Sequence, residues 1–97
     1  MHFVRLIHVK VPDDQMAKAE KIWREDCGPL MKQAQGCVSE ELLKCLDAPG
    51  EYISYSEWES EAAIEAYRVS PAHAEIQRHS QALQGAKAVV KRYSVIP

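Results

Sequence analysis

The segment EWESEAAIEAYRVSPAH, residues 57–73, indicates how the chain is organised. It begins at the end of an alternating, strand-like stretch and passes into two short helical patterns. Ser60 is placed to cap a helix over 61–69, and Pro71 suits the first position of the next helix because no backbone N–H is needed there. An apolar stripe with helical spacing follows in that second helix, formed by Ala72, Ile76, His79 and Leu83. The segment therefore predicts a strand followed by two consecutive helices.

Strand patterns flank these helices on both sides. CVSEELLKCL, 37–46, and EYISYSEW, 51–58, are two strand-like runs separated by DAPG, 47–50, which has the composition of a tight turn. Two adjacent strands joined in this way form an antiparallel hairpin. After Gly85 the chain reads as a last strand over 86–96.

The N-terminal part contains one strand and one long helical pattern. HFVRLIHVKV, 2–11, alternates, so that an apolar side carries Phe3, Ile7, Val9, Val11 and, among them, Arg5. Asp13 and Asp14 offer a helix cap after it, and the apolar stripe of the following helix consists of Met16, Ala19, Trp23, Cys27 and Leu30. Trp23 is expected in the core. The Gly28-Pro29 step is expected to kink or interrupt this helix, which resumes and ends at Gly36.

The element order is strand, helix, strand, strand, helix, strand over a single domain, residues 1–97. This order predicts a ferredoxin-like α+β fold, in which two helices cover one face of a four-stranded antiparallel sheet. The other face has no cover within the monomer, and a second copy of the chain is the simplest way to remove it from water. We therefore expect a homodimer.

Composition excludes several classes of protein. Twelve Lys and Arg residues against fourteen Asp and Glu give a net charge of −2, and the basic residues are scattered, which argues against a nucleic-acid partner. No apolar run approaches the ~18 residues of a membrane span, and the N-terminus does not read as a signal peptide, so we expect a cytoplasmic protein. Cys27, Cys37 and Cys45 show no metal-ligand spacing and are expected as unpaired thiols.

The run from Gly36 to His73 resembles the antibiotic biosynthesis monooxygenase family, whose domains form dimeric α+β barrels. The matching features are Gly36-Cys37, Glu41-Leu42, Asp47 with Pro49, Glu57-Trp58 and an Ala-rich helix followed by Ser70-Pro71-x-His73. VKVPDD at 9–14 and RYSVI at 92–96 also fit, so the likeness spans nearly the whole chain.

The resemblance implies oxygenation of a small phenolic, quinol or polyketide-like aromatic substrate by O₂. It also implies that neither metal nor flavin takes part, because such electron-rich substrates react with O₂ themselves. The protein then supplies a dry cavity, orientation and a base. Two alternatives remain open: an isomerase or lyase on the same barrel, and a dimer that binds a small ligand without chemistry.

Heme chemistry is disfavoured by the residues at three positions. Heme degraders of this superfamily use an Asn, a Trp and a His where matching of strand and helix register places Ile7, Tyr67 and Gln77. His73 and His79 lie four residues before and two after Gln77, out of register for an iron ligand. Ile7 and Gln77, together with Trp58 at the strand–helix junction, are instead candidates for substrate contact, although Trp58 also suits a packing role.

Three residues are candidates for catalysis. Tyr67 could orient an aromatic substrate through its phenol or lie half-buried with its hydroxyl in water. His73 could act as a base near neutral pH or be a surface residue of the first helical turn. Arg5, a cation on an apolar strand face, could bind a phenolate or carboxylate, pair with an internal acid, or leave at the edge of the sheet.

Overall fold

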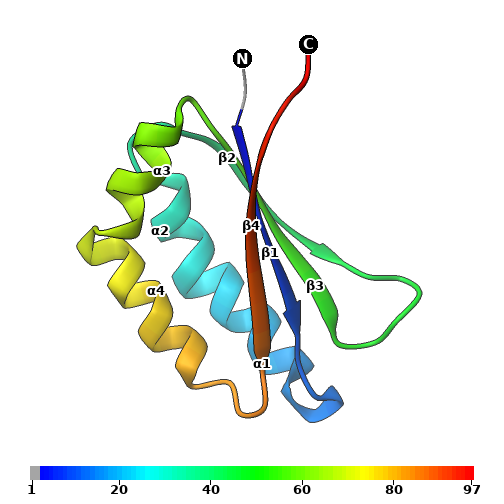
Figure 1. Ribbon diagram of the computed structural model, residues 1–97. Helices are drawn as coiled ribbons and strands as arrows, with labels where there is room; N and C mark the ends of the chain where they lie inside the picture. Colours follow the sequence, from blue (N-terminus) through cyan, green and yellow to red (C-terminus); the bar gives the residue numbers. More distant parts are fainter. Residues whose placement is uncertain (1–2) are drawn as a thin grey trace.

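The computed structural model describes residues 3–97, which form one four-stranded antiparallel sheet with a helical layer on one face (Figure 1). The strands are β1 (Phe3–Lys10), β2 (Cys37–Lys44), β3 (Glu51–Trp58) and β4 (Lys87–Ser94). They lie in the order β2-β3-β1-β4, which confirms the predicted ferredoxin-like α+β fold. The sheet is open, with β2 and β4 at its edges. His2, predicted as the start of the first strand, lies outside the described residues.

The helical layer consists of two segments that run along the sheet (Figure 1). The first contains a 3-10 turn η1 (Asp13–Gln15), α1 (Met16–Ile22), a π-helical turn η2 (Trp23–Cys27) and α2 (Gly28–Lys32). The second contains α3 (Glu61–Arg68) and α4 (Pro71–Gln81). Ser60 caps α3 as predicted, because its hydroxyl accepts a hydrogen bond from the backbone N–H of Ala63. Pro71 begins α4 as predicted, and the Ser70 hydroxyl caps this helix by accepting from the backbone N–H of His73.

At the Gly28-Pro29 step, where a kink or interruption is predicted, a π turn interrupts the α-helical hydrogen bonding and the helix continues beyond it. The backbone N–H of Gly28 donates to the carbonyl of Trp23, five residues earlier, so the chain widens into a π turn and continues as α2. Pro29 has no N–H and its ring crowds an ordinary α-helical turn, and one extra residue per turn accommodates both effects. Met31 and Gly28 are the buried residues of α2, while Leu30 is only half-buried.

Strand register decides which side chains face the helices. β1 pairs with β3 so that Arg5 lies opposite Ser56 and Ile7 opposite Ser54. Side chains opposite one another share a face, so Arg5 points toward the helical layer together with the alternating buried residues of β3. Those buried residues are Tyr52, Ser54, Ser56 and Trp58. The core that holds sheet and helices together is formed by Met31, Trp58, Ile64 and Tyr67.

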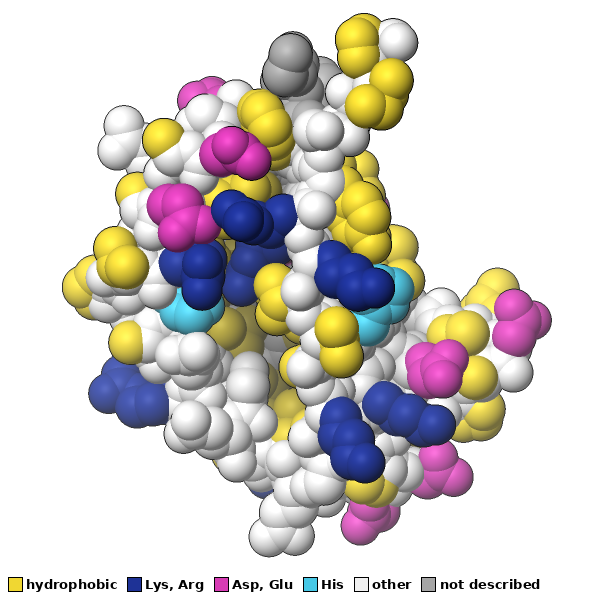
Figure 2. All heavy atoms as spheres, in the orientation of Figure 1, with side chains coloured by type: hydrophobic (Ala, Val, Ile, Leu, Met, Phe, Trp, Pro, Cys, Tyr) yellow, Lys and Arg dark blue, Asp and Glu magenta, His cyan; other side chains and the backbone are white. Residues whose placement is uncertain are grey.

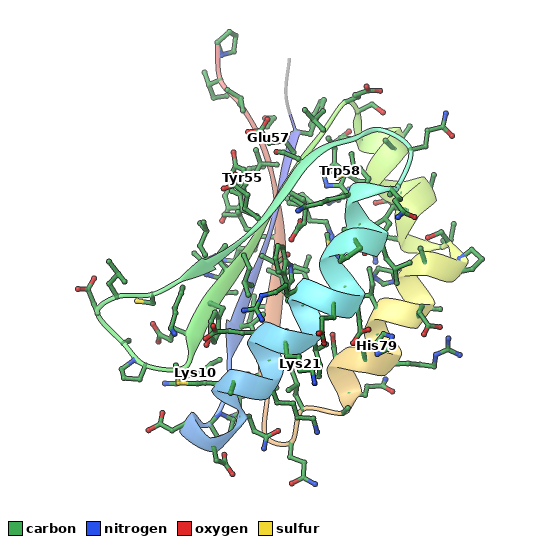
Figure 3. All side chains as sticks on the ribbon, turned by 180° about the vertical axis from the view of Figure 1, so that it is seen from behind. Lys10, Lys21, Tyr55, Glu57, Trp58 and His79 are labelled. Carbon is green, nitrogen blue, oxygen red and sulfur yellow. The ribbon has the colours of Figure 1, made fainter. Side chains whose placement is uncertain are left out.

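The opposite face of the sheet is bare. Among its residues, Leu43, Val89 and Tyr93 each expose more than two fifths of their surface, and all eight residues of β4 are exposed. Figure 3 shows Tyr55 and Glu57 on this side of the sheet, away from the helices. Within residues 3–97 nothing covers this face.

Candidate functional site

A cavity of about 500 Å³ lies between the sheet and the two helical segments. Its walls include Ile7 and Val9 of β1, Trp23, Ser54 of β3, and Ile76 and Gln77 of α4. Two of the residues predicted for substrate contact, Ile7 and Gln77, therefore line it. Most of the wall is apolar with a few polar groups, which is the usual character of a small-molecule site.

A buried acid stands behind this wall. Glu40 of β2 is only 3% exposed, and its Oε1 accepts hydrogen bonds from the Ser54 hydroxyl at 2.7 Å and the Trp23 indole N–H at 3.1 Å. Its Oε2 is buried without a partner in the described residues. Burial raises the pKa of Glu40 to about 7, against the opposing effect of the two hydrogen bonds and of Arg5. The carboxyl is therefore poised to take or give a proton near neutral pH.

Sequence reasoning missed Glu40 and misjudged Trp23. The irregular pairing between Cys37 and Ser39 breaks the alternation of β2, so the strand reads as mixed and Glu40 looks like one more surface acid. A usable signal lies in β3, where Ser54 and Ser56 occupy positions that alternation assigns to the buried face. Trp23, expected in the core, is half-buried and lines the cavity.

Arg5 is a buried cation without a counter-ion. It is 4% exposed, and its guanidinium carbon lies 5.5 Å from the centre of the Tyr67 ring. Its Nε has no hydrogen-bond partner, and within residues 3–97 no acid lies in ion-pair distance of it. Burial lowers the pKa of Arg5, although an arginine stays charged near neutral pH. Of the predicted alternatives, neither the internal ion pair nor the exit at the sheet edge is found.

Tyr67 and His73 lie beside Arg5. The Tyr67 ring meets the His73 ring edge-on, with centroids 5.1 Å apart and an interplanar angle of 87°. Burial raises the pKa of Tyr67 to about 12, so its hydroxyl keeps its proton at neutral pH. Burial lowers the pKa of His73, helped by the nearby charges of Arg5 and Arg68, so its imidazole is neutral at pH 7. The three predicted catalytic residues thus form one cluster, although none of them lines the 500 Å³ cavity.

Trp58 packs beneath this cluster. It is 0% exposed, its ring centre is 5.1 Å from that of Tyr67, and its indole N–H donates to the Ser56 hydroxyl at 2.8 Å. Figure 3 shows it between the sheet and the helices. Its predicted contact with substrate stays a prediction, and its place in the structure fits the packing role that the sequence also suggested.

Helices α3 and α4 leave a hollow between themselves and β4, with Lys, Arg, His and acidic side chains gathered around it (Figure 2). One carboxylate spans this gap: Glu65 of α3 lies 3.0 Å from Arg92 of β4 and 3.3 Å from Arg68. A second hollow of about 630 Å³ lies along the Phe3 and Ser94 end of the same gap, and Arg92 belongs to its wall.

The fold and the site together define a class of protein: a ferredoxin-like α+β domain with a small-molecule cavity, a buried acid and a buried cation between sheet and helices. The family model described as antibiotic biosynthesis monooxygenase matches residues 2–79. The chain belongs to this family, as the resemblance indicated.

Solved structures show the same fold at low identity. The chain is similar to Rv0793 from Mycobacterium tuberculosis, with a TM-score of 0.82, 16% identity, and coverage of 100% of this chain and 97% of that one. It is also similar to a variant of SnoaB, a cofactor-independent oxygenase from Streptomyces nogalater, with a TM-score of 0.82, 14% identity, and coverage of 97% and 92%. No curated protein sequence matches the chain.

Residues 3–97 contain no helix whose length and apolar character would let it cross a membrane. They also contain no group of three or more His, Cys, Asp or Glu side chains arranged to hold a metal ion.

Proposed function

We propose that the chain is a cofactor-independent monooxygenase that oxidises a small phenolic, quinol-like or polyketide-like aromatic compound in the cavity between sheet and helices. The observation that carries the proposal is the hydrogen bond from Ser54, in the cavity wall, to the buried carboxyl of Glu40. A substrate hydroxyl in the cavity can donate its proton to the Ser54 oxygen as the Ser54 proton passes to Glu40. The product is a phenolate, which is the form that reacts with O₂.

The reaction balances without an external reductant. A phenol with a free ring C–H that reacts with O₂ gives a quinone and one water, so one oxygen atom enters the ring and the other leaves as water. All the electrons come from the substrate. The protein's task is to place the ring, remove the first proton and stabilise the anion, which are effects of positioning and charge.

Other residues of the cavity wall, and the cluster of Arg5, Tyr67 and His73 beside it, have supporting roles in this proposal. The Trp23 indole N–H stabilises the ionised form of Glu40, and the Ile7 and Gln77 side chains hold the ring. The unpaired charge of Arg5 favours the anionic substrate. Tyr67, whose pKa is about 12, acts as a hydrogen-bond donor, and neutral His73 is available for a later proton transfer. These roles extend the sequence-based prediction, with Glu40 added as the first proton acceptor.

We further propose that two copies pack through their bare sheet faces to form the homodimer expected for this family, and that the protein acts in the cytoplasm. The exposed apolar side chains Leu43, Val89 and Tyr93 on that face support the dimer, because their burial is favourable.

Oxygen consumption tests the proposed reaction. The full chain is incubated with a panel of phenols and hydroquinones in the presence of a metal chelator, and O₂ uptake and incorporation of isotopically labelled oxygen are measured. We expect turnover that Glu40→Gln lowers by roughly a hundredfold or more, which is the usual contribution of a general base. Glu25→Gln is the control, because Glu25 is an exposed acid of η2, away from the bare sheet face and from the cavity wall. No uptake with any member of the panel contradicts the proposal.

A second candidate function uses the same proton relay without oxygen. An isomerase or lyase needs the Ser54–Glu40 pair to move a proton but consumes no O₂. Product formed under anaerobic conditions, and lost in Glu40→Gln, would assign this function instead.

A further inference from the structure

Three arginines converge on the gap between β4 and α3. Arg5 and Arg92 are directly opposite one another in the pairing of β1 with β4, so both point to the helical side of the sheet. Arg68, at the end of α3, is close enough for its charge to act on both Arg5 and His73. Like charges facing each other across strands are unfavourable unless an anion lies between them.

The gap contains too little negative charge to balance the three arginines. Glu65 is the single acid in ion-pair distance of Arg92 and Arg68 among the described residues, and it does not reach Arg5. Glu40 acts on Arg5 from a distance, but its raised pKa of about 7 leaves it partly protonated at neutral pH. Arg5 is 4% exposed and its Nε is unpartnered. A buried guanidinium without a counter-ion is costly, so this position favours an anionic ligand.

We propose that this gap is a binding site for the carboxylate of a ligand, which displaces Glu65 from Arg92 and Arg68 and is received by Arg5. An arginine presents planar, paired N–H donors that match the two oxygens of a carboxylate. If the ligand is also the substrate of the proposed function, on which this part of the inference rests, it carries both a phenol and a carboxylate. The substrate class is then a hydroxylated aromatic carboxylic acid.

The distance between Arg5 and Ile7 along β1 is short enough for one ligand to reach both the gap and the cavity. Arg5 and Ile7 are consecutive residues on the helix-facing side of the strand, so they are separated by about 6.6 Å. Ile7 lines the cavity, whereas Arg5 lies at the gap beside Tyr67. A ligand whose carboxylate meets Arg5 therefore carries its ring toward the apolar wall at Ile7. The Glu65–Arg92 ion pair closes the gap in the absence of that ligand.

Binding of salicylate against salicylamide tests the site directly. The two probes share a phenol and a ring, and differ in that only salicylate carries a charged carboxylate. Isothermal titration calorimetry on the full chain should give an affinity for salicylate about tenfold or more above that for salicylamide, as expected for charge-assisted hydrogen bonds. Arg5→Gln and Arg92→Gln should each remove most of this preference.

Glu65→Gln gives the most specific readout, because it should strengthen binding. Removing the competing carboxylate frees Arg92 and Arg68, so salicylate should bind several-fold more tightly while the affinity for salicylamide stays the same. Glu59→Gln is the matched control: it removes one negative charge just before the same helix, but Glu59 is exposed and is paired with no arginine among the described residues. This comparison leaves Arg5 unchanged, so it still tests the site if the Arg5→Gln variant fails to fold.

Three outcomes would overturn the site: equal affinity for acid and amide, equal effects of Glu65→Gln and Glu59→Gln, or an unchanged preference in Arg92→Gln. Oxygen uptake is measured separately, so the two proposals can fail independently. Turnover of neutral phenols without preference for salicylate would leave the proposed function in place and reject the carboxylate site. Binding of salicylate without O₂ uptake from any phenol would do the reverse.

Discussion

The hydroxyl of Ser54 donates a 2.7 Å hydrogen bond to Oε1 of Glu40 across the neighbouring strands β3 and β2. This contact connects the cavity wall to an acid whose pKa burial raises to about 7. A buried acid with a raised pKa affects the free energy of unfolding as well as proton transfer, because ionising Glu40 costs more in the folded chain than in the unfolded chain.

The free energy of unfolding should fall as pH rises toward neutrality, because of Glu40. The folded-state pKa of Glu40 lies above its ordinary value of 4.5, so the unfolded chain ionises first and the folded state loses stability as pH rises from about 4.5 to about 7. The difference between the two pKa values of Glu40 corresponds to a loss of on the order of 3 kcal/mol in the free energy of unfolding. In Glu40→Gln this contribution should disappear. Urea unfolding at about pH 5 and about pH 8 measures it, and an unchanged pH dependence in the variant would contradict the assignment. Glu25→Gln, at an exposed acid of η2, serves as control.

Trp23→Phe should raise the pKa of Glu40 further. The substitution removes the indole N–H that donates to the carboxylate at 3.1 Å and keeps most of the apolar surface. A hydrogen bond to a charged group contributes about 1.5–3 kcal/mol, so the upper end of the pH range over which Glu40 lowers stability should move up by roughly one to two pH units. Urea unfolding at closely spaced pH values between about 5 and about 9 locates this upper end; its movement to lower pH would mean that the indole does not stabilise the ionised form.

Gly50→Ala should destabilise the protein more than Gly85→Ala. Both glycines have positive φ, 83° and 75°, and a left-handed alanine costs roughly 1–2 kcal/mol. At Gly50 a Cβ would also collide with the carbonyl oxygen of Val11, whereas at Gly85 it would meet the Pro12 ring at 3.0 Å. The free energies of unfolding of the two variants measure the difference. Equal values would indicate that the backbone at Gly50 moves to accept the side chain.

Val89→Glu should dissociate the proposed dimer. Val89 lies on the bare sheet face and is 55% exposed in the single chain, so two carboxylates would be buried against each other in a face-to-face pair. Val69→Glu is the control, since Val69 follows α3 and is 85% exposed on the helical side. Sedimentation velocity should give a monomer for Val89→Glu and a dimer for Val69→Glu and the unchanged chain. A monomeric unchanged chain would reject the dimer itself.

Much of the fold could be predicted from local patterns. Strand-like runs bounded by turn residues located all four strands, and Ser60 and Pro71 marked the starts of α3 and α4, because caps, turns and periodicity depend on residues that are close in sequence. The π turn before Pro29 could not be predicted in this way. Proline indicates a break, and whether the helix ends or widens depends on the sheet against which it packs.

The contributions of sequence and of tertiary structure are easier to tell apart at the candidate site than in the fold. The sequence by itself determined that Arg5 lies on the helix-facing side of its strand, since alternation needs only the neighbours in the chain. Only the tertiary structure decided that Glu40 is buried behind Ser54 and Trp23, that Arg5 lies over Tyr67 without a counter-ion, and that Glu65 bridges to Arg92. Burial and charge pairing depend on which residues meet across strands and helices, and they set the pKa of each group through desolvation and partners that no local pattern contains.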